Sequence, residues 1–192
     1  MAPIIGIMAS ANWASANASS FDSIATATAA GGETSFTFSS IPSTYKHLQI
    51  RILYKDTYST TANTQVTQLQ FNGDTGTNYV YHYLQGNGTS ATAGGATGQT
   101  AAFVVNSGGT SAAGQTSIFG VGIADILDYA STSKNKTIRS IGGLNNNTTS
   151  TSIYLGLSSS LWLNTAAITS IKILPGNIAF AAGTTFALYG IK

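Results

Sequence analysis

The sequence predicts an all-β protein, a jelly-roll-like antiparallel β-sandwich with an extended N-terminal arm. Three observations support this prediction. Apolar side chains recur mainly at every second residue, which is the period of a half-buried strand. Clusters of Gly, Asn, Ser and Pro separate these runs at short intervals, as they do in sandwiches and barrels. No segment carries the apolar stripe of an amphipathic helix.

We divide the chain into an N-terminal arm, residues 1–20, and a single β-sandwich domain, residues 21–192. The arm is small and apolar and lacks continuous strand alternation. We expect it either to cover an edge of the sandwich or to reach a neighbouring subunit, with its large side chains as a candidate assembly interface. These side chains are Ile4, Ile5, Ile7 and Trp13.

The first half of the domain supplies the clearest strands. Residues 34–41 place two phenylalanines on one face. Residues 45–56 alternate most regularly, and only Leu53 interrupts their polar side. The apolar side of this strand consists of Leu48, Ile50, Ile52 and Tyr54. Residues 66–71 change phase midway, which predicts a bulge or bend.

The second half is expected to contain strands within residues 101–105, 151–163, 167–174 and 184–191. The segment 151–163 places Ile153, Leu155 and Leu157 together. Residues 86–117 are rich in Gly, Ala, Thr and Ser. We expect them to form either a long surface loop with one short strand or a flexible excursion.

The segment "FNGDTGTNYVYHYL" raises the question of an ion-binding loop. A calcium loop requires a second oxygen ligand where Gly76 follows Asp74, and a phosphate loop requires a lysine that is missing here. The pair Asn72-Gly73 instead favours a hairpin turn, because both residues tolerate positive φ. We therefore interpret the segment as a turn leading into a strand.

That strand carries a row of tyrosines. Tyr79, Tyr81 and Tyr83 share one face, and a histidine lies on the other. Such a row packs against a partner sheet, anchors a protein interface or stacks on sugar rings. We retain the three tyrosines as a candidate aromatic contact face.

Charged residues make up only 7% of the chain, against roughly 25% in typical soluble domains. Polar surfaces with few charges repel one another only weakly, which favours a protein that works as part of an assembly. The alternative is a secreted domain whose composition simply includes few charged residues. The net charge of +2 is too small and too scattered for nucleic-acid binding. The chain contains no cysteine, and no stretch approaches the roughly 20 apolar residues of a membrane helix. We therefore expect neither nucleic acid nor membrane as a partner.

The inventory of reactive residues argues against catalysis, metal binding and cofactors. Asp125 and Asp128, the nearest pair of acids, are three residues apart, which on a strand directs them to opposite faces. His47 and His82 are the two histidines, and no Gly-x-Ser-x-Gly motif is present. We assign no catalytic residue, no metal ligand and no cofactor.

Four segments together resemble a group of small virion proteins of tailed bacteriophages. They are "FSSIPSTYKHLQIRI" (38–52), "QFNGDTGTNYVYHYL" (70–84), "LWLNTAAITSIKI" (161–173) and "FALYGI" (186–191). The resemblance spans about residues 21–191, and its specificity lies in the order and combination of the segments. It implies a non-enzymatic component of the virion, assembled in the host cytoplasm, with a jelly-roll-like fold and no catalytic residues to transfer.

Two roles within such a virion are considered. In the first, the chain is a capsid decoration (cement) protein that stabilises the head, and its partners are the major capsid protein and copies of itself in a homotrimer. The chain shows no coiled-coil heptad or repetitive shaft of the kind that projects a fibre tip, which favours this role. The alternative is a tail-fibre or receptor-binding protein that recognises host surface glycans. A glycan-active enzyme is disfavoured by the few acids and histidines.

Overall fold

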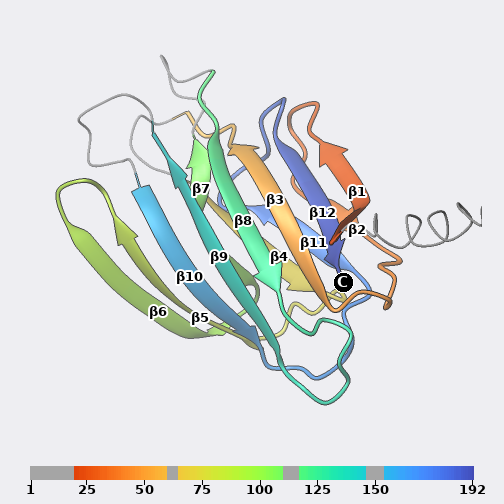
Figure 1. Cartoon of the computed structure of the whole chain (residues 1–192). Coiled ribbons are helices and arrows are strands. Elements are labelled where there is room, and N and C mark those ends of the chain that lie inside the picture. The colour runs from red at the N-terminus through yellow and green to blue at the C-terminus, as the bar shows by residue number, and fades with distance from the viewer. Residues whose placement is uncertain (1–19, 60–64, 110–116, 146–153) are drawn as a thin grey trace, which may run out of the picture.

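The computed structural model describes residues 20–59, 65–109, 117–145 and 154–192, and this part of the chain is all-β (Figure 1). Its strands are β1 (Phe21–Thr28), β2 (Phe36–Phe38), β3 (His47–Lys55), β4 (Gln65–Phe71), β5 (Tyr79–Gly86), β6 (Ala91–Gln99), β7 (Ala102–Gly109), β8 (Gly120–Ile126), β9 (Lys136–Leu144), β10 (Tyr154–Trp162), β11 (Ile171–Pro175) and β12 (Thr185–Ile191). Among the residues described, no helix is long and apolar enough to span a membrane.

Eight of the strands pair with jelly-roll connectivity. These eight are the strands that remain when β5, β6, β9 and β10 are set aside. Counted in chain order among the eight, the first pairs with the eighth, the second with the seventh, the third with the sixth and the fourth with the fifth. These antiparallel pairs are β1–β12, β2–β11, β3–β8 and β4–β7. The ladders β12–β3 and β11–β4 complete two packed sheets. The predicted jelly-roll-like β-sandwich is confirmed.

The other four strands enlarge one sheet. β9 pairs with β8, β10 with β9, β5 with β10 and β6 with β5, all antiparallel. The large sheet therefore runs β1-β12-β3-β8-β9-β10-β5-β6, and the small sheet runs β2-β11-β4-β7 (Figure 1). A short parallel contact between β3 and β7 joins the two sheets. We call β10, β5 and β6 the wing; they lie together at the left in Figure 1.

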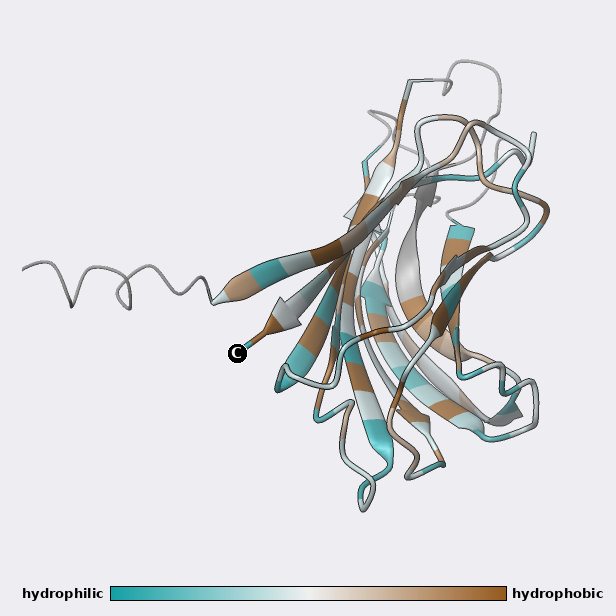
Figure 2. Cartoon of the chain, turned by 90° about the vertical axis from the view of Figure 1, so that its right-hand side faces the viewer, coloured by the Kyte–Doolittle hydropathy of each residue, from teal (hydrophilic) through white to brown (hydrophobic). Residues whose placement is uncertain are grey.

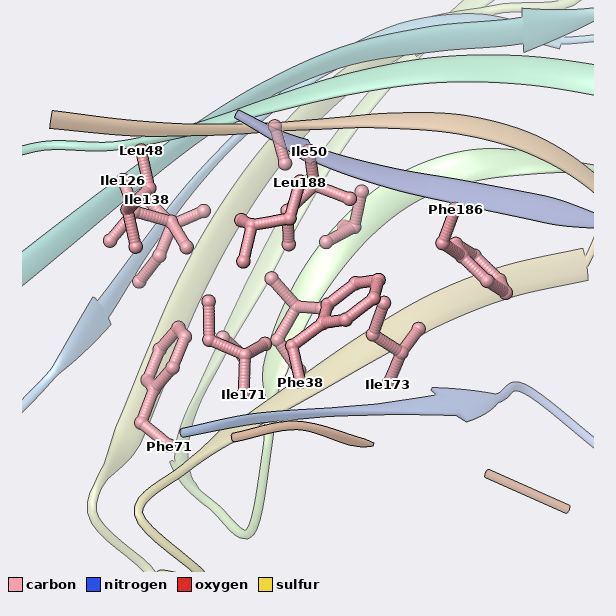
Figure 3. Close-up of a cluster of buried hydrophobic side chains, with 14 of the residues drawn as sticks. Phe38, Leu48, Ile50, Phe71, Ile126, Ile138, Ile171, Ile173, Phe186 and Leu188 are labelled. Carbon is pink, nitrogen blue, oxygen red and sulfur yellow. The ribbon is translucent and has the colours of Figure 1, made fainter. Parts of the chain in front are cut away.

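The core fills the space between the two sheets. Figure 3 shows aliphatic and aromatic side chains from the two sheets pointing toward one another. The predicted apolar face of β3 is buried, and Leu53 is exposed on the opposite face. Figure 2 shows the alternation of hydrophobic and hydrophilic residues along the strands. The predicted two-residue period is therefore the period of burial in β3, β11 and β12.

The turn at Asn72-Gly73 is confirmed, but the hairpin is not. Asn72 has φ 53° and Gly73 has φ 72°, and the Asp74 N–H donates to the Phe71 carbonyl at 2.9 Å. The strands on either side do not pair with each other, because β4 lies in the small sheet and β5 lies in the large one. This turn therefore carries the chain from one sheet to the other.

Residues 86–117 differ from both expectations. Most of the described part of this segment lies in β6 and β7, which are strands of eight or nine residues. Because these strands consist largely of small residues, they lack the alternation of bulky apolar and polar side chains by which a strand is recognised in a sequence. The strand predicted within residues 101–105 is part of β7, whereas β1, β6, β8 and β9 were not predicted. The expected arm residues Ile4, Ile5, Ile7 and Trp13 lie outside the described residues.

Candidate interaction surface

The strands β8 and β10 bury small residues and expose large ones. In β10, Ser158 and Ser160 are buried, whereas Leu155 and Leu157 are exposed. The sequence pattern placed these leucines together correctly, but a half-buried strand usually directs its aliphatic residues into the core. Here the usual orientation is reversed, and the large sheet presents an apolar outer face.

The reason for this reversal is the strand β7, which packs across β9 and β10. The Ser160 hydroxyl donates to the carbonyl of Phe103 in β7 at 2.8 Å. A serine side chain is too short to bridge the roughly 10 Å between ordinary packed sheets, so β7 must approach the large sheet closely. Below it, Gly122, Gly142 and Gly156 are paired across three strands and buried. At these positions the inner face has no space for large side chains.

The outer face carries a band of aliphatic side chains that we call the apolar band. Its members are Leu53, Leu84, Val121, Ile123, Ile141, Leu155 and Leu157. Their exposed fractions range from 38% for Ile123 to 68% for Leu155.

The centre of the band is a continuous cross-strand row. Ile123 lies opposite Ile141, Ile141 opposite Leu157, and Leu157 opposite Leu84. Directly opposed side chains have Cβ atoms about 4.5–5.5 Å apart, so the row forms one surface. Full burial of one such side chain contributes about 1.5–3 kcal/mol, so covering seven half-exposed ones would contribute several kcal/mol before ordering costs. Contiguous apolar surface of this kind marks interaction sites.

A hollow of about 570 Å³ lies within the apolar band. Its walls include Val121 and Leu155, and between them Gly143 pairs with both residues and has no side chain of its own. A Cβ atom at Gly143 would lie 2.6 Å from the Tyr154 carbonyl oxygen, so a larger residue does not fit there. The hollow can therefore accept apolar side chains from another polypeptide.

A polar network borders the band on the same face. Asp125 accepts hydrogen bonds from Gln49 Nε2 at 2.9 Å and from Arg139 Nη2 at 3.0 Å. Arg51 donates to Gln49 Oε1 at 3.1 Å and lies 4.5 Å from the centre of the Tyr189 ring. Arg51, Gln49, Asp125 and Arg139 therefore form one network across β3, β8 and β9. The wing contains no Asp, Glu, Lys or Arg.

The three candidate tyrosines do share one face, but it is the inner face of β5. Tyr79 is fully buried and stacks with Trp162, with ring centroids 6.3 Å apart, so it cannot contribute to an exposed contact face. Tyr81 stacks on Phe103 with centroids 4.7 Å apart, and both Tyr81 and Tyr83 are half-buried. The exposed face of β5 instead presents Leu84 and His82. Sequence alternation identified the row, but it could not tell which face is covered.

The Asp74 turn is a structural joint. The Asp74 carboxylate accepts hydrogen bonds from Trp162 Nε1 at 2.7 Å, from Asn78 Nδ2 at 3.0 Å and from the Gly76 N–H at 2.8 Å. The Trp162 indole, followed by the Asn78 amide, holds the pKa of this carboxyl below its usual value. These donors occupy the oxygens that an ion would need, so the segment fastens β10 to the turn.

The four segments that carry the bacteriophage resemblance meet in pairs. Asn72 donates from its amide to the Ala167 carbonyl at 2.8 Å, and its Oδ1 accepts from the Thr169 N–H at 2.8 Å. Together with the bond between Asp74 and Trp162, these contacts join 70–84 to 161–173. The Tyr45 ring covers Gly190, where a Cβ would lie 2.3 Å from ring atoms, and this contact joins 38–52 to 186–191. Residues of these motifs therefore hold the four segments together in pairs.

Of the reactive residues singled out in the sequence, His47 and Asp128 contact each other, with His47 Nδ1 3.7 Å from the Asp128 carboxylate. His47 Nδ1 accepts from the Asp128 N–H at 3.0 Å, and Lys134 Nζ lies 2.7 Å from the Asp128 carboxylate, which lowers the pKa of that acid. His82 lies away from this group, on β5. Within the described ranges, no cluster of three or more His, Asp and Glu could hold a metal ion.

Comparison of the chain with protein-family models, with curated proteins and with solved structures finds no match.

Proposed function

We propose that this protein is a non-enzymatic structural component of a tailed-bacteriophage virion, and that it is a capsid decoration (cement) protein. The observation that carries the proposal is the apolar band on the outer face of the large sheet. A decoration protein needs a broad surface that packs against neighbouring subunits, and aliphatic rows on a rigid sheet supply one. The resemblance of the four motif segments to virion proteins of tailed bacteriophages is the reason for proposing a bacteriophage virion as the assembly.

The alternative, recognition of host glycans, receives less support from the same face. Sugar binding uses exposed aromatic rings and converging hydrogen-bond donors. The Tyr79 ring is buried, and the rings of Tyr81 and Tyr83 pack on Phe103. The outer face offers aliphatic groups that make no hydrogen bonds. These features favour protein–protein packing over glycan recognition.

The test is immunogold electron microscopy of intact virions of the phage that encodes this chain, with antibody raised against the purified protein and pre-immune serum as the control. We expect label spread over the head. Label confined to the tail or its fibres would overturn the decoration role and support receptor binding. Virions without label would contradict a virion role on either part of the particle.

A functional readout complements the labelling. Heads assembled without the protein should release their DNA at a lower temperature than complete heads, and adding the purified protein should restore the higher temperature. Heads that bind the protein with no gain in thermal resistance would contradict the cement role. Binding of the isolated protein to host cells or lipopolysaccharide, with none to heads, would favour the alternative.

A further inference from the structure

The apolar band needs an occupant, and the chain itself contains a matching segment. We propose that residues 1–19 of one copy bind the apolar band of a neighbouring copy. This inference deepens the proposed assembly role and rests on it. It assigns both sides of a contact between copies, the segment that carries Ile4, Ile5, Ile7 and Trp13 and the outer face of β8, β9, β10 and β5.

The first argument is the match in chemistry. Residues 1–19 contain no Asp, Glu, Lys or Arg, and they include three isoleucines, two methionines and a tryptophan. Residues 75–124, which contain β5 to β7 and most of β8, are equally free of these charged types. A partner with charged groups would lose their hydration on this face without gaining an ion pair. An uncharged apolar segment has no such penalty.

The second argument is the shape of the face. The hollow between Val121 and Leu155 is open to the outside and is lined mainly by glycines and aliphatic side chains, together with Asn87, Asn145 and Tyr154. Its 570 Å³ falls within the 300–1,000 Å³ typical of ligand pockets. Large apolar side chains such as Ile5 and Trp13 are suitable for filling it, and the flat row from Ile123 to Leu84 continues beside it.

The third argument concerns the choice of a neighbouring copy. The register pairs Phe21 with Ile191 and Ile191 with His47, so the segment joins the sheet at the His47 end of β3. Between this point and the apolar band lie Arg51, which stacks on Tyr189, and the bonded Gln49, Asp125 and Arg139 network. To reach the band of its own chain, the segment would have to cross these charged groups. A neighbouring copy can present its band directly.

Nineteen fully extended residues span about 63–68 Å, which is enough to reach across an adjacent domain of this size. The reach is therefore sufficient for exchange between neighbours around a closed ring. Such head-to-tail contacts close when the rotation between copies is a simple fraction of a turn. A homotrimer, which was considered above for the decoration role, is one such closed ring.

Disulfide trapping in the full-length chain tests the proposal, because the protein has no cysteine of its own. One preparation carries Ile5→Cys and a second carries Leu155→Cys, and the two are mixed under mild oxidation. We expect a covalent heterodimer that forms at least tenfold faster than in the matched mixture of Ile5→Cys with Thr137→Cys. Thr137 is also exposed on the outer face but lies outside the apolar band.

Further variants distinguish residues 1–19 of a neighbouring copy from other possible occupants of the apolar band. Rapid pairing of Leu155→Cys with itself would show that two bands face each other, and it would overturn the assignment of residues 1–19. A chain carrying both cysteines that closes within one polypeptide, while the uncross-linked protein sediments as a monomer, would overturn the exchange between copies. Equal rates for Leu155→Cys and Thr137→Cys would overturn the proposal altogether.

Substitution of the face gives an independent readout. We expect Leu157→Asp, in the centre of the row, to weaken self-association in sedimentation by at least tenfold, whereas Ser159→Asp, two residues along the same exposed face, changes it less than twofold. Equal effects of the two substitutions would contradict the proposal. These measurements use purified protein alone, so their failure would leave the virion labelling unaffected, and absence of virion label would leave a positive cross-link standing.

Discussion

The substitution Asp74→Asn tests whether the turn after β4 fastens the two sheets. The carboxylate accepts hydrogen bonds from Trp162, Asn78 and Gly76, with both of its oxygens in use. An asparagine keeps the shape but has only one acceptor oxygen. If that oxygen faces Trp162, the new amide N–H₂ meets the Gly76 N–H. If the amide is reversed, it meets the indole N–H instead.

The size of the effect follows from the bonds lost. A hydrogen bond to a charged group contributes about 1.5–3 kcal/mol, and the variant loses one such bond and weakens the others. Because the turn is partly exposed, we expect a loss of about 2 kcal/mol in the free energy of unfolding at pH 7. In a domain of this size that corresponds to a decrease of about 4–8 °C in Tm. Urea denaturation followed by tryptophan fluorescence measures the free energy.

The dependence on pH provides the control. The bonded donors lower the pKa of Asp74 in the folded state, relative to about 3.9 in the unfolded chain. The folded state therefore binds this proton less readily, and the carboxylate stabilises the protein fully above about pH 4. That contribution disappears as the pH falls through the folded-state pKa. The difference between wild type and Asp74→Asn should shrink below pH 4; an equal Tm at pH 7, or a gap that is constant with pH, would refute the reasoning.

Three further substitutions test other contacts by thermal unfolding. Gly190→Ala places a methyl group 2.3 Å from atoms of the Tyr45 ring and should cost about 1–3 kcal/mol; an unchanged Tm would contradict this packing. Lys136→Ala removes a buried ammonium that donates to two backbone carbonyls and should cost about 2–4 kcal/mol, and a neutral result would show that water replaces it. Ser160→Val enlarges a buried residue beneath β7 and should cost about 1–3 kcal/mol, whereas Ser159→Val on the exposed face should change stability by less than about 0.5 kcal/mol; similar values would contradict the close approach of β7.

The fold class was predictable because alternation survives in the strands that build the jelly-roll core. β3 and β12 each bury one side of a regular pattern, and bulky residues make that pattern visible. β6 was missed, and β7 was predicted only in part, because Gly, Ala and Thr give no contrast between faces. Gly94 and Gly95 are small because Tyr83 and His82 of the adjacent strand lie over them. That requirement arises from a neighbouring strand and is not visible in the local sequence.

The candidate interaction surface was not predictable from periodicity. The pattern of β10 groups Leu155 with Leu157, but it cannot say whether that group faces the core or the outside. The direction is decided by β7, which comes from a distant part of the sequence and leaves space only for serine and glycine beneath it. Alternation likewise placed the tyrosines of β5 on one face, but it could not say that Phe103 of β7 packs against that face. Alternation identifies faces, and long-range packing decides which one is covered.

The absence of charge from β10, β5 and β6 determines which conditions a contact on these strands would withstand. Ionic strength acts by screening charges, and these strands have none to screen. A contact between subunits on these strands would therefore persist at both low and high salt concentration. Apolar contacts weaken on cooling and strengthen in sulfate. A particle held together through this wing would therefore loosen in the cold, and a change of salinity would leave it intact.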